Sequence, residues 1–438
     1  MTENQGNRRS LMIILLTVFI DLVGFSIIFP LFPDMLEYYL GKEPDGSWLH
    51  QLVASLENLS GREGAEARFA ATVFFGGLLG SLYSLLQFVA APLWGSLSDR
   101  IGRRKVLIFT VTGIAISYLC WFVAEPFWLL IVARVIGGAM AGNLSVASAA
   151  IADITDEKSR AKGMGMLGAA FGLGFVVGPA IGGALSLVDA ESLLSFVPGI
   201  NPFSAPALFA LVISIANLCF LIKYFPETLQ PENISHDKRP VNPLAIFRPS
   251  PHAGVNLTTW LYFVFIAAFA AMEFTITFLA KDRFAYTAFQ NVALFVFIGF
   301  VVVLVQGGVV RRVVPKYGEK KVALIGWAMV IPGMLVVAVC ASQWQLYVGL
   351  FLLSCGSSLL TPCLNALVSL YAPASDQGAT MGIFRSFGSL ARAIAPLVGA
   401  IIYWQYGSSW PYLTAGVLLI IFYLALFRLP QPGEGSTD

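Results

Sequence analysis

Apolar residues fall into twelve long runs along this chain of 438 residues, and charged residues gather between the runs. A helix needs about 20 consecutive apolar residues to cross a bilayer. The pattern therefore predicts twelve transmembrane helices. They cover residues 11–38, 69–97, 106–124, 127–150, 162–187, 206–224, 255–280, 288–310, 322–340, 346–370, 379–403 and 412–427.

The composition excludes a water-soluble protein. Hydrophobic residues make up 57% of the chain and charged residues only 12%, whereas soluble domains carry about 25% charged residues. We therefore expect an all-α integral multi-pass membrane protein. The five cysteines lie inside apolar runs without metal-ligand spacing, so we expect no metal and no cofactor.

Basic residues orient the predicted helices. With the N-terminus inside, 19 of the 27 Lys and Arg fall in cytoplasmic segments and 5 in outer segments. Because cytoplasmic loops are enriched in Lys and Arg, we expect both termini in the cytoplasm. The short tails favour a bacterial inner (cell) membrane.

Two longer loops and an internal repeat suggest the domain organisation. The outer loop 41–68 predicts a short amphipathic helix, and the polar, Pro-rich segment 225–254 predicts a cytoplasmic linker. "DRIGRRKV" and "PKYGEKKV" match at an offset of 216 residues, and "GPAIGG" matches "APLVGA" at 217. We expect two pseudo-symmetric six-helix bundles, residues 1–224 and 255–438, joined by the linker 225–254.

The loop after the second predicted span, "GSLSDRIGRRKV", joins a carboxylate to a basic cluster. One hypothesis is topology marking by the basic residues. The other is a gating latch in which Asp99 contacts a helix N-terminus or an arginine such as Arg103 or Arg104.

This loop resembles the signature loop of the major facilitator superfamily. "RVIGG" and "GFVVGPAIGG" are similar to motifs of its twelve-span drug:proton antiporters, and "AAIADITDEKSRAKGMG" to the tetracycline-efflux branch. "EFTITFLAKDRF" and "GIFRSFGSLARAIAPL" resemble the tetracycline-transporter-like (TETRAN-like) proteins of vertebrates. The resemblance implies the major facilitator fold and secondary transport, and it does not imply a substrate.

Glycines recur every fourth residue in the fifth predicted span, at Gly174, Gly178 and Gly182. Such a strip lets another helix approach closely, and Pro179 can bend its helix. The pattern is consistent with ordinary tight packing and with an additional gating role for Gly178 and Pro179.

Two carboxylates fall inside predicted spans. Asp21 lies about 15 Å along the first helix from Leu11, near the bilayer centre, where a charge costs at least ~3 kcal/mol. It is either a structural aspartate with a hydrogen-bond donor or a group that loads and releases a proton. Glu273 in the seventh span is the second proton-coupling candidate.

Three arginines share this region, namely Arg134, Arg385 and Arg392. Since arginine keeps its charge, three arginines against two acids leave one positive charge, which favours an anionic substrate. Arg392 is the preferred anion contact, and packing is the alternative role for Arg134. Gln87, Asn143 and Gln306 could line the substrate site or bond neighbouring helices.

The expected function is proton-coupled antiport, in the efflux direction, of small amphiphilic organic compounds, organic anions among them. The alternatives are an uncoupled facilitator or symporter on the same fold, and a non-transporting receptor or accessory subunit. No catalytic or phosphate-loop motif appears, so we do not expect an enzyme. The expected partners are a small-molecule substrate, protons and the lipid bilayer, with no nucleic acid, and we expect a monomer.

Overall fold

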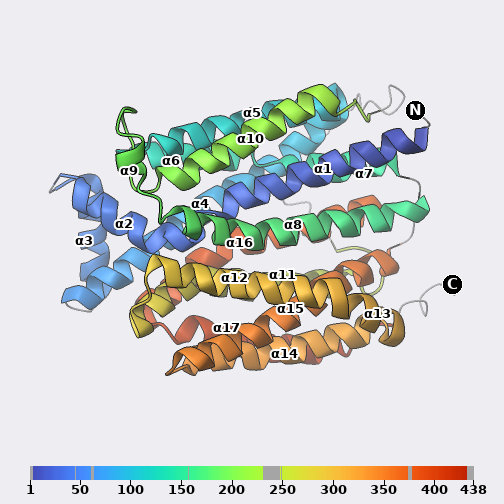
Figure 1. The fold of residues 1–438 in the computed structure, drawn as a ribbon. Coiled ribbons are helices and arrows are strands. Elements are labelled where there is room, and N and C mark those ends of the chain that lie inside the picture. The colour runs from blue at the N-terminus through green and yellow to red at the C-terminus, as the bar shows by residue number, and fades with distance from the viewer. Residues whose placement is uncertain are drawn as a thin grey trace. The chain divides into compact units, whose positions relative to one another are not determined.

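The structure is a computed structural model, and it describes residues 3–44, 46–60, 64–155, 157–229, 247, 249–372 and 377–431 (Figure 1). Over these residues every regular element is a helix. This confirms the all-α prediction.

Helices from the first part of the chain precede the predicted linker. They are α1 (Glu3–Ser26), the 3₁₀ turn η1 (Phe29–Leu31), α2 (Phe32–Lys42), α3 (Trp48–Ser60), α4 (Gly64–Ile101), α5 (Arg103–Phe122), α6 (Phe127–Met140), α7 (Asn143–Ile154), α8 (Glu157–Leu185), α9 (Ala190–Leu193) and α10 (Ser204–Tyr224).

The remaining helices follow the predicted linker. They are α11 (Val255–Phe284), α12 (Ala288–Leu304), the π-helix η4 (Val305–Val310), α13 (Arg311–Tyr317), α14 (Glu319–Val339), α15 (Gln343–Tyr371), α16 (Gln377–Tyr406) and α17 (Trp410–Leu426). The π-helix continues directly from α12 and contains Gly307 and Gly308.

Eleven described helical segments are long and apolar enough to cross a membrane, and the apolar helix α17 is slightly shorter. Together they account for the twelve predicted spans. The outer loop contains the amphipathic helix α3, as predicted.

Two predicted spans are wrong in detail because each is broken. The first helix ends at Ser26 instead of continuing to residue 38, and η1 with Pro30 separates it from α2. Proline has no backbone N–H to continue a helical ladder. The fourth span breaks between α6 and α7 at Ala141 and Gly142, so that Asn143 stands at a helix start and not within a helix.

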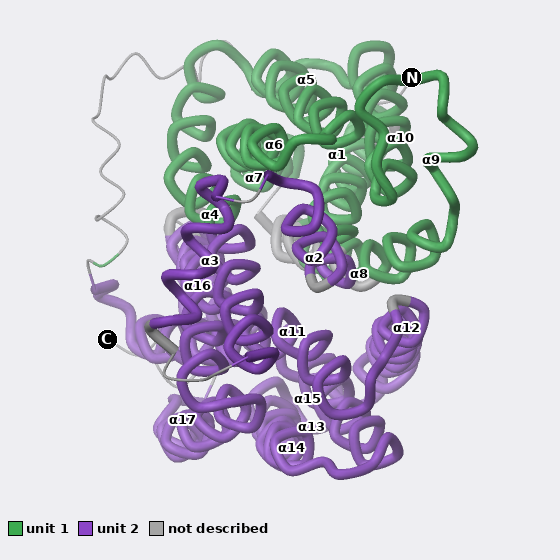
Figure 2. Tube along the Cα trace, turned by 90° about the vertical axis from the view of Figure 1, so that its left-hand side faces the viewer, with its two compact units in different colours: residues 1–28, 82–248 green, residues 29–81, 249–438 purple. Residues whose placement is uncertain are grey.

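The chain divides into two compact units, shown in Figure 2. Unit 1 comprises residues 1–28 and 82–248, and unit 2 comprises residues 29–81 and 249–438. The boundary at residues 81 and 82 lies inside α4. The assignment of bundles by chain order, 1–224 and 255–438, stays a prediction, and most of the predicted linker 225–254 lies outside the described residues.

The same helix pairings occur in both units. In unit 1, α1 packs on α8, and α5 packs on α6 and α10. In unit 2 the helices at the equivalent positions of the repeat pair likewise: α11 with α16, and α14 with α15 and α17. This repetition supports the internal repeat inferred from the sequence.

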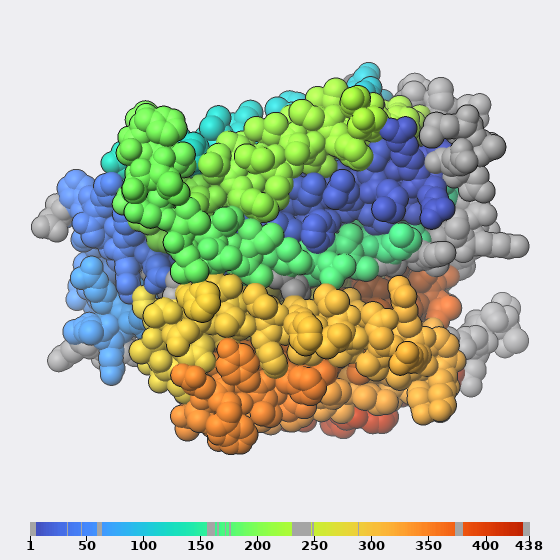
Figure 3. Space-filling view, viewed as in Figure 1, coloured from blue at the N-terminus to red at the C-terminus, as the bar shows by residue number. Residues whose placement is uncertain are grey.

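The glycine strip of α8 explains how closely α1 and α8 pack. A Cβ atom added to Gly174 would lie 2.7 Å from the carbonyl oxygen of Phe19, and one on Gly182 would lie 1.9 Å from that of Ile27. The predicted close approach is therefore confirmed. Figure 3 shows α1 lying between α8 and α10 on the visible face of unit 1.

The outer surface of these helices is apolar. Met12 on α1 and Val212 on α10 are more than half exposed. Such side chains suit contact with lipid because the hydrocarbon core offers no partner for polar groups.

Candidate functional site

Asp21 lies in unit 1 at the centre of a polar cluster built from several helices. The amide Nδ2 of Asn143 donates to Asp21 Oδ2 at 2.5 Å. The hydroxyl of Thr110 in turn contacts Asn143 Oδ1. Asn143 is thereby held by α5 and presented to α1, an orientation that depends on the break between α6 and α7.

The second carboxylate oxygen of Asp21 is less well satisfied. Oδ1 is buried and has no hydrogen-bond partner among the residues that the structure describes. The Asp21 side chain as a whole remains partly exposed. A buried carboxylate oxygen without a donor is costly when charged, so this atom is suited to carry a proton.

Two tyrosines, Tyr83 and Tyr118, also belong to this cluster. The charges of Asp21 and Arg134 act on the hydroxyl groups of both. The hydroxyl of Tyr118 lies against α1 one turn beyond Asp21, where a Cβ on Gly24 would be 2.2 Å from it. Tyr83 packs against Phe25, with ring centroids 4.5 Å apart and the ring planes tilted by 31°. These aromatic rings line the apolar side of the cluster.

Arg134 is buried about two turns into α6, as predicted. Its Cζ lies 5.4 Å from the ring centroid of Trp121 and 5.8 Å from that of Tyr83. Aromatic faces attract a guanidinium. The structure thus brings Arg134 into the Asp21 cluster through rings.

Unit 2 holds the second predicted acid. Glu273 on α11 is 8% exposed, and the positive charge of Arg392 on α16 acts on it. Arg385 lies two turns earlier on α16 and interacts with Tyr262, whose ring stacks on Phe384 at 4.0 Å. Two arginines and one acid therefore lie along this pair of helices.

Gln87 and Gln306, two predicted site residues, are not linked to the two acids by hydrogen bonds in the described structure. Within the described part of the chain, no hydrogen bond joins Gln87 or Gln306 to Asp21 or Glu273. Gln87 is part of α4, and Gln306 belongs to the π-helix η4. Their predicted role in substrate binding stays a prediction.

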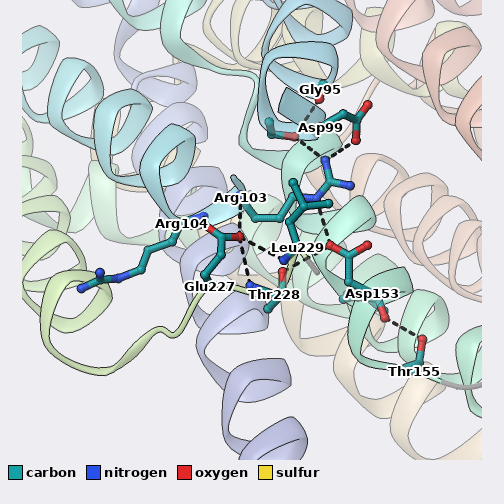
Figure 4. A network of polar contacts seen from close by, with 11 residues as sticks. Gly95, Asp99, Arg103, Arg104, Asp153, Thr155, Glu227, Thr228 and Leu229 are labelled. Atoms are coloured by element: carbon teal, nitrogen blue, oxygen red, sulfur yellow. Dashed lines mark hydrogen bonds and ion pairs between the residues drawn. The ribbon is translucent and has the colours of Figure 1, made fainter. Parts of the chain in front are cut away.

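The signature loop forms an ionic network in unit 1 around the buried side chain of Arg103, drawn in Figure 4. Arg103 Nη1 contacts Asp99, and Arg103 Nε donates to Asp153 Oδ2 at 3.0 Å. The contact required by the latch hypothesis is therefore present, and its gating function stays a prediction. Sequence reasoning did not identify Asp153, which follows an apolar run near the end of α7.

Known proteins resemble this chain over nearly its whole length. The sequence pattern that defines the Major Facilitator Superfamily matches residues 14–316 and 309–438. The mouse major facilitator superfamily domain-containing protein 10 is 34% identical over 99% of this chain and 95% of its own length. The class E tetracycline resistance protein of Escherichia coli is 29% identical, covering 97% of this chain and 96% of its own.

A solved structure agrees with these relatives. The crystal structure of the human organic anion transporter MFSD10 (TETRAN) superposes with a TM-score of 0.77 at 29% identity. It covers 96% of this chain and 99% of its own.

Proposed function

Because the chain belongs to the major facilitator superfamily, and is therefore an integral membrane transporter and not an enzyme, we propose that it exchanges protons for small amphiphilic organic compounds. The proposed mechanism is alternating access, in which the substrate site faces one side of the membrane at a time. Organic anions are the proposed substrate class.

The observation that carries this proposal is the unequal satisfaction of the two Asp21 oxygens. Asn143 donates to Oδ2, while Oδ1 is buried without a partner in the described structure. Asn143 can hold the carboxyl in place in both protonation states, and Oδ1 can accept the proton. Protonation removes a charge from the membrane interior and thereby changes the relative energies of the transporter's conformations.

Charge in unit 2 supports an anionic substrate. Arg385 and Arg392 lie seven residues apart on α16, and the charge of Arg392 acts on Glu273. Guanidinium groups bind carboxylate and phosphate groups through paired N–H donors, so two arginines on one helix suit an anionic substrate. The similar human protein is an organic anion transporter, which agrees with this assignment.

The second candidate is an uncoupled facilitator or symporter on the same fold. The hydrogen bond from Asn143 to Asp21 favours this candidate, because a carboxylate held by a donor can serve structure alone, without carrying protons. A non-transporting receptor or accessory subunit is disfavoured because buried charges are costly in a membrane.

The membrane arrangement completes the proposal. The distribution of basic residues supports cytoplasmic termini, and we expect the transporter to act as a monomer. The bacterial inner membrane stays a prediction, since the relatives come from both animals and bacteria.

The experiment compares Asp21→Asn with the wild type in proteoliposomes that are acidic inside, with the membrane potential clamped. The probe is fluorescein, a fluorescent organic anion, and tetraphenylphosphonium is the cationic comparison. One-for-one exchange would concentrate fluorescein about tenfold per pH unit. Asp21→Asn should abolish this accumulation and leave fluorescein binding intact.

Asp34→Asn is the matched control, since Asp34 lies on α2 and pairs with Lys281 at 3.1 Å. It should retain pH-driven uptake. Unchanged coupling in Asp21→Asn would remove Asp21 from the mechanism, and accumulation of the cation in place of fluorescein would refute the anionic substrate class.

A further inference from the structure

The N-terminus of α5 is unusually rich in positive charge. The helix begins with Arg103, Arg104 and Lys105, its first turn has no acidic residue, and its N-cap residue Gly102 has no side chain. The exposed N–H groups give a helix N-terminus a partial positive charge, so cations are unfavourable there. This helix start requires a carboxylate from elsewhere in the chain.

Glu227 supplies that carboxylate from three residues beyond the end of α10. Its Oε1 accepts from the backbone N of Arg103 at 2.8 Å, and its Oε2 accepts from the backbone N of Arg104 at 3.2 Å. A Cβ at residue 102 would lie 2.3 Å from Oε2. Gly102, with φ +105°, therefore leaves room for the carboxylate.

Arg104 makes the reciprocal contact. Its Nη2 donates at 2.6 Å to the carbonyl oxygen of Ile222 in the last turn of α10. A cation at a helix C-terminus is favourable for the same reason that an anion is favourable at the N-terminus. The N-terminus of α5 and the C-terminus of α10 therefore cap each other. Figure 4 shows the Glu227 carboxylate at the start of α5.

The same segment also contacts the latch. Oε1 of Glu227 accepts from the backbone N of Thr228 and of Leu229, both at 3.0 Å. The Thr228 hydroxyl donates to Asp153 Oδ2 at 3.3 Å, the oxygen that also accepts from Arg103 Nε. The backbone of Arg103 is thus held by Glu227, and its side chain is held by Asp153, which also accepts a hydrogen bond from Thr228.

In the second half of the repeat, the equivalent helix N-terminus is capped in a different way. At the offset of 216 residues, Gly318 also has a positive φ of +78° and is the N-cap residue of α14. Lys320, equivalent to Arg104, donates to the carbonyl oxygens of Phe427 and Leu429 after the last helix. There, however, the first helical residue is Glu319. The first half has Arg103 at that position and obtains its acid from Glu227.

We propose that Glu227 is a positioning residue of the cytoplasmic latch. It holds Arg103 against Asp99 and Asp153 and anchors residues 225–229 to α5. The start of the linker at residues 225–229, α5 and the end of α7 then move as one body.

Hydrogen–deuterium exchange of the purified transporter tests the anchor without reference to any substrate. Glu227→Ala should speed exchange at residues 103–106 and 225–229 about fivefold, the change expected for losing one helix cap. Glu191→Gln, a change at an exposed carboxylate on α9, is the control and should leave both segments unchanged. Unchanged exchange in Glu227→Ala would overturn the proposal.

A second variant separates helix capping from anchoring. Lys105→Glu in the Glu227→Ala background places an acid in the third position of α5, where it can satisfy the helix N-terminus from within. Exchange at residues 103–106 should return to the wild-type rate, while residues 225–229 should stay fast. Recovery of both segments would show that Glu227 is only a cap.

A kinetic readout, which rests on the proposed function, tests positioning. In Glu227→Ala, the maximal rate of fluorescein uptake per folded transporter should differ from that of the wild type, with KM unchanged. Adding Lys105→Glu should not restore the wild-type maximal rate. An unchanged maximal rate despite faster exchange would refute the positioning role. Absence of fluorescein uptake in the wild type would contradict the proposed function and leave the exchange test of the anchor intact.

Discussion

The glycine strip of α8 makes a quantitative prediction for Gly182→Ala. A Cβ at this position would lie 1.9 Å from the carbonyl oxygen of Ile27, whereas real Cβ atoms essentially never come within 3.0 Å of another heavy atom. The atom in the way belongs to the backbone, so no side-chain rotation can relieve the clash. The α1 and α8 backbones would have to separate by about 1 Å.

The energetic cost follows from two opposing effects. Overpacking a close-packed interface costs about 1–3 kcal/mol, and more where backbone must move. Replacing glycine by alanine within a helix returns about 1 kcal/mol. Because backbone must move here, the cost lies at the upper end of this range, and we expect a net destabilisation of about 2 kcal/mol.

Gly172 on the same helix provides the matched control. A Cβ there would meet no heavy atom of the described residues within 4 Å, so Gly172→Ala retains only the favourable helix-propensity effect. In thermal unfolding of the two variants in one detergent, Gly182→Ala should melt below the wild type and Gly172→Ala at or above it. Equal melting temperatures for the two variants would refute the steric argument.

The remaining predictions concern the end of α11 in unit 2. Arg283→Gln should lower the free energy of unfolding by about 2–3 kcal/mol, because buried carbonyl and hydroxyl groups lose a charged donor. Arg283 donates to the carbonyl oxygens of Ala338 and Cys340 at 3.0 Å and to Ser409 Oγ at 2.6 Å. Lys281→Gln is the comparison variant, because the ion pairs of Lys281 with Asp34 and Glu37 are partly exposed. Exposed ion pairs contribute about 0–1 kcal/mol, so Lys281→Gln should lower the melting temperature less than Arg283→Gln. An equal decrease in melting temperature for the two variants would contradict this ranking. Burial raises the pKa of the Cys340 thiol despite the nearby Arg283, so less thiolate is present at pH 8 than in free cysteine, and maleimide labelling followed by mass spectrometry should be slower and accelerate as the pH rises. Labelling of Cys340 at the rate of free cysteine would show that the thiol is accessible and its pKa unshifted.

The sequence predicted the elements that depend on hydrophobic length and local spacing. The twelve spans follow from apolar runs, and the contact between Asp99 and Arg103 joins residues four apart. The close approach of α1 and α8 follows from glycines at every fourth residue. Each of these signals lies within a single stretch of the chain.

Features that depend on two distant stretches were not predicted. Asn143 was predicted to line the substrate site or to bond neighbouring helices, and it does bond Thr110 and Asp21. Asp21 could not be inferred as its partner, because the helix break at Ala141 and Gly142 was not predicted. Glu227 carried one signal, a lone acid directly after a span in "YFPET". Its target 124 residues earlier could not be inferred, since an unsatisfied helix N-terminus has no fixed sequence partner.

The π-helix at residues 305–310 alters the geometry of the eighth span. A π turn closes one residue later than an α turn, so the side-chain rows on either side are offset by one residue, about 100° around the axis. A Cβ on Gly307 or Gly308 would meet no atom of the described part of the chain within 4 Å, so tight contact there does not account for glycine at either position. The span is thus two helical segments whose side chains face different directions, so that α12 packs against α15 while α13, on the other side of the π turn, packs against α14.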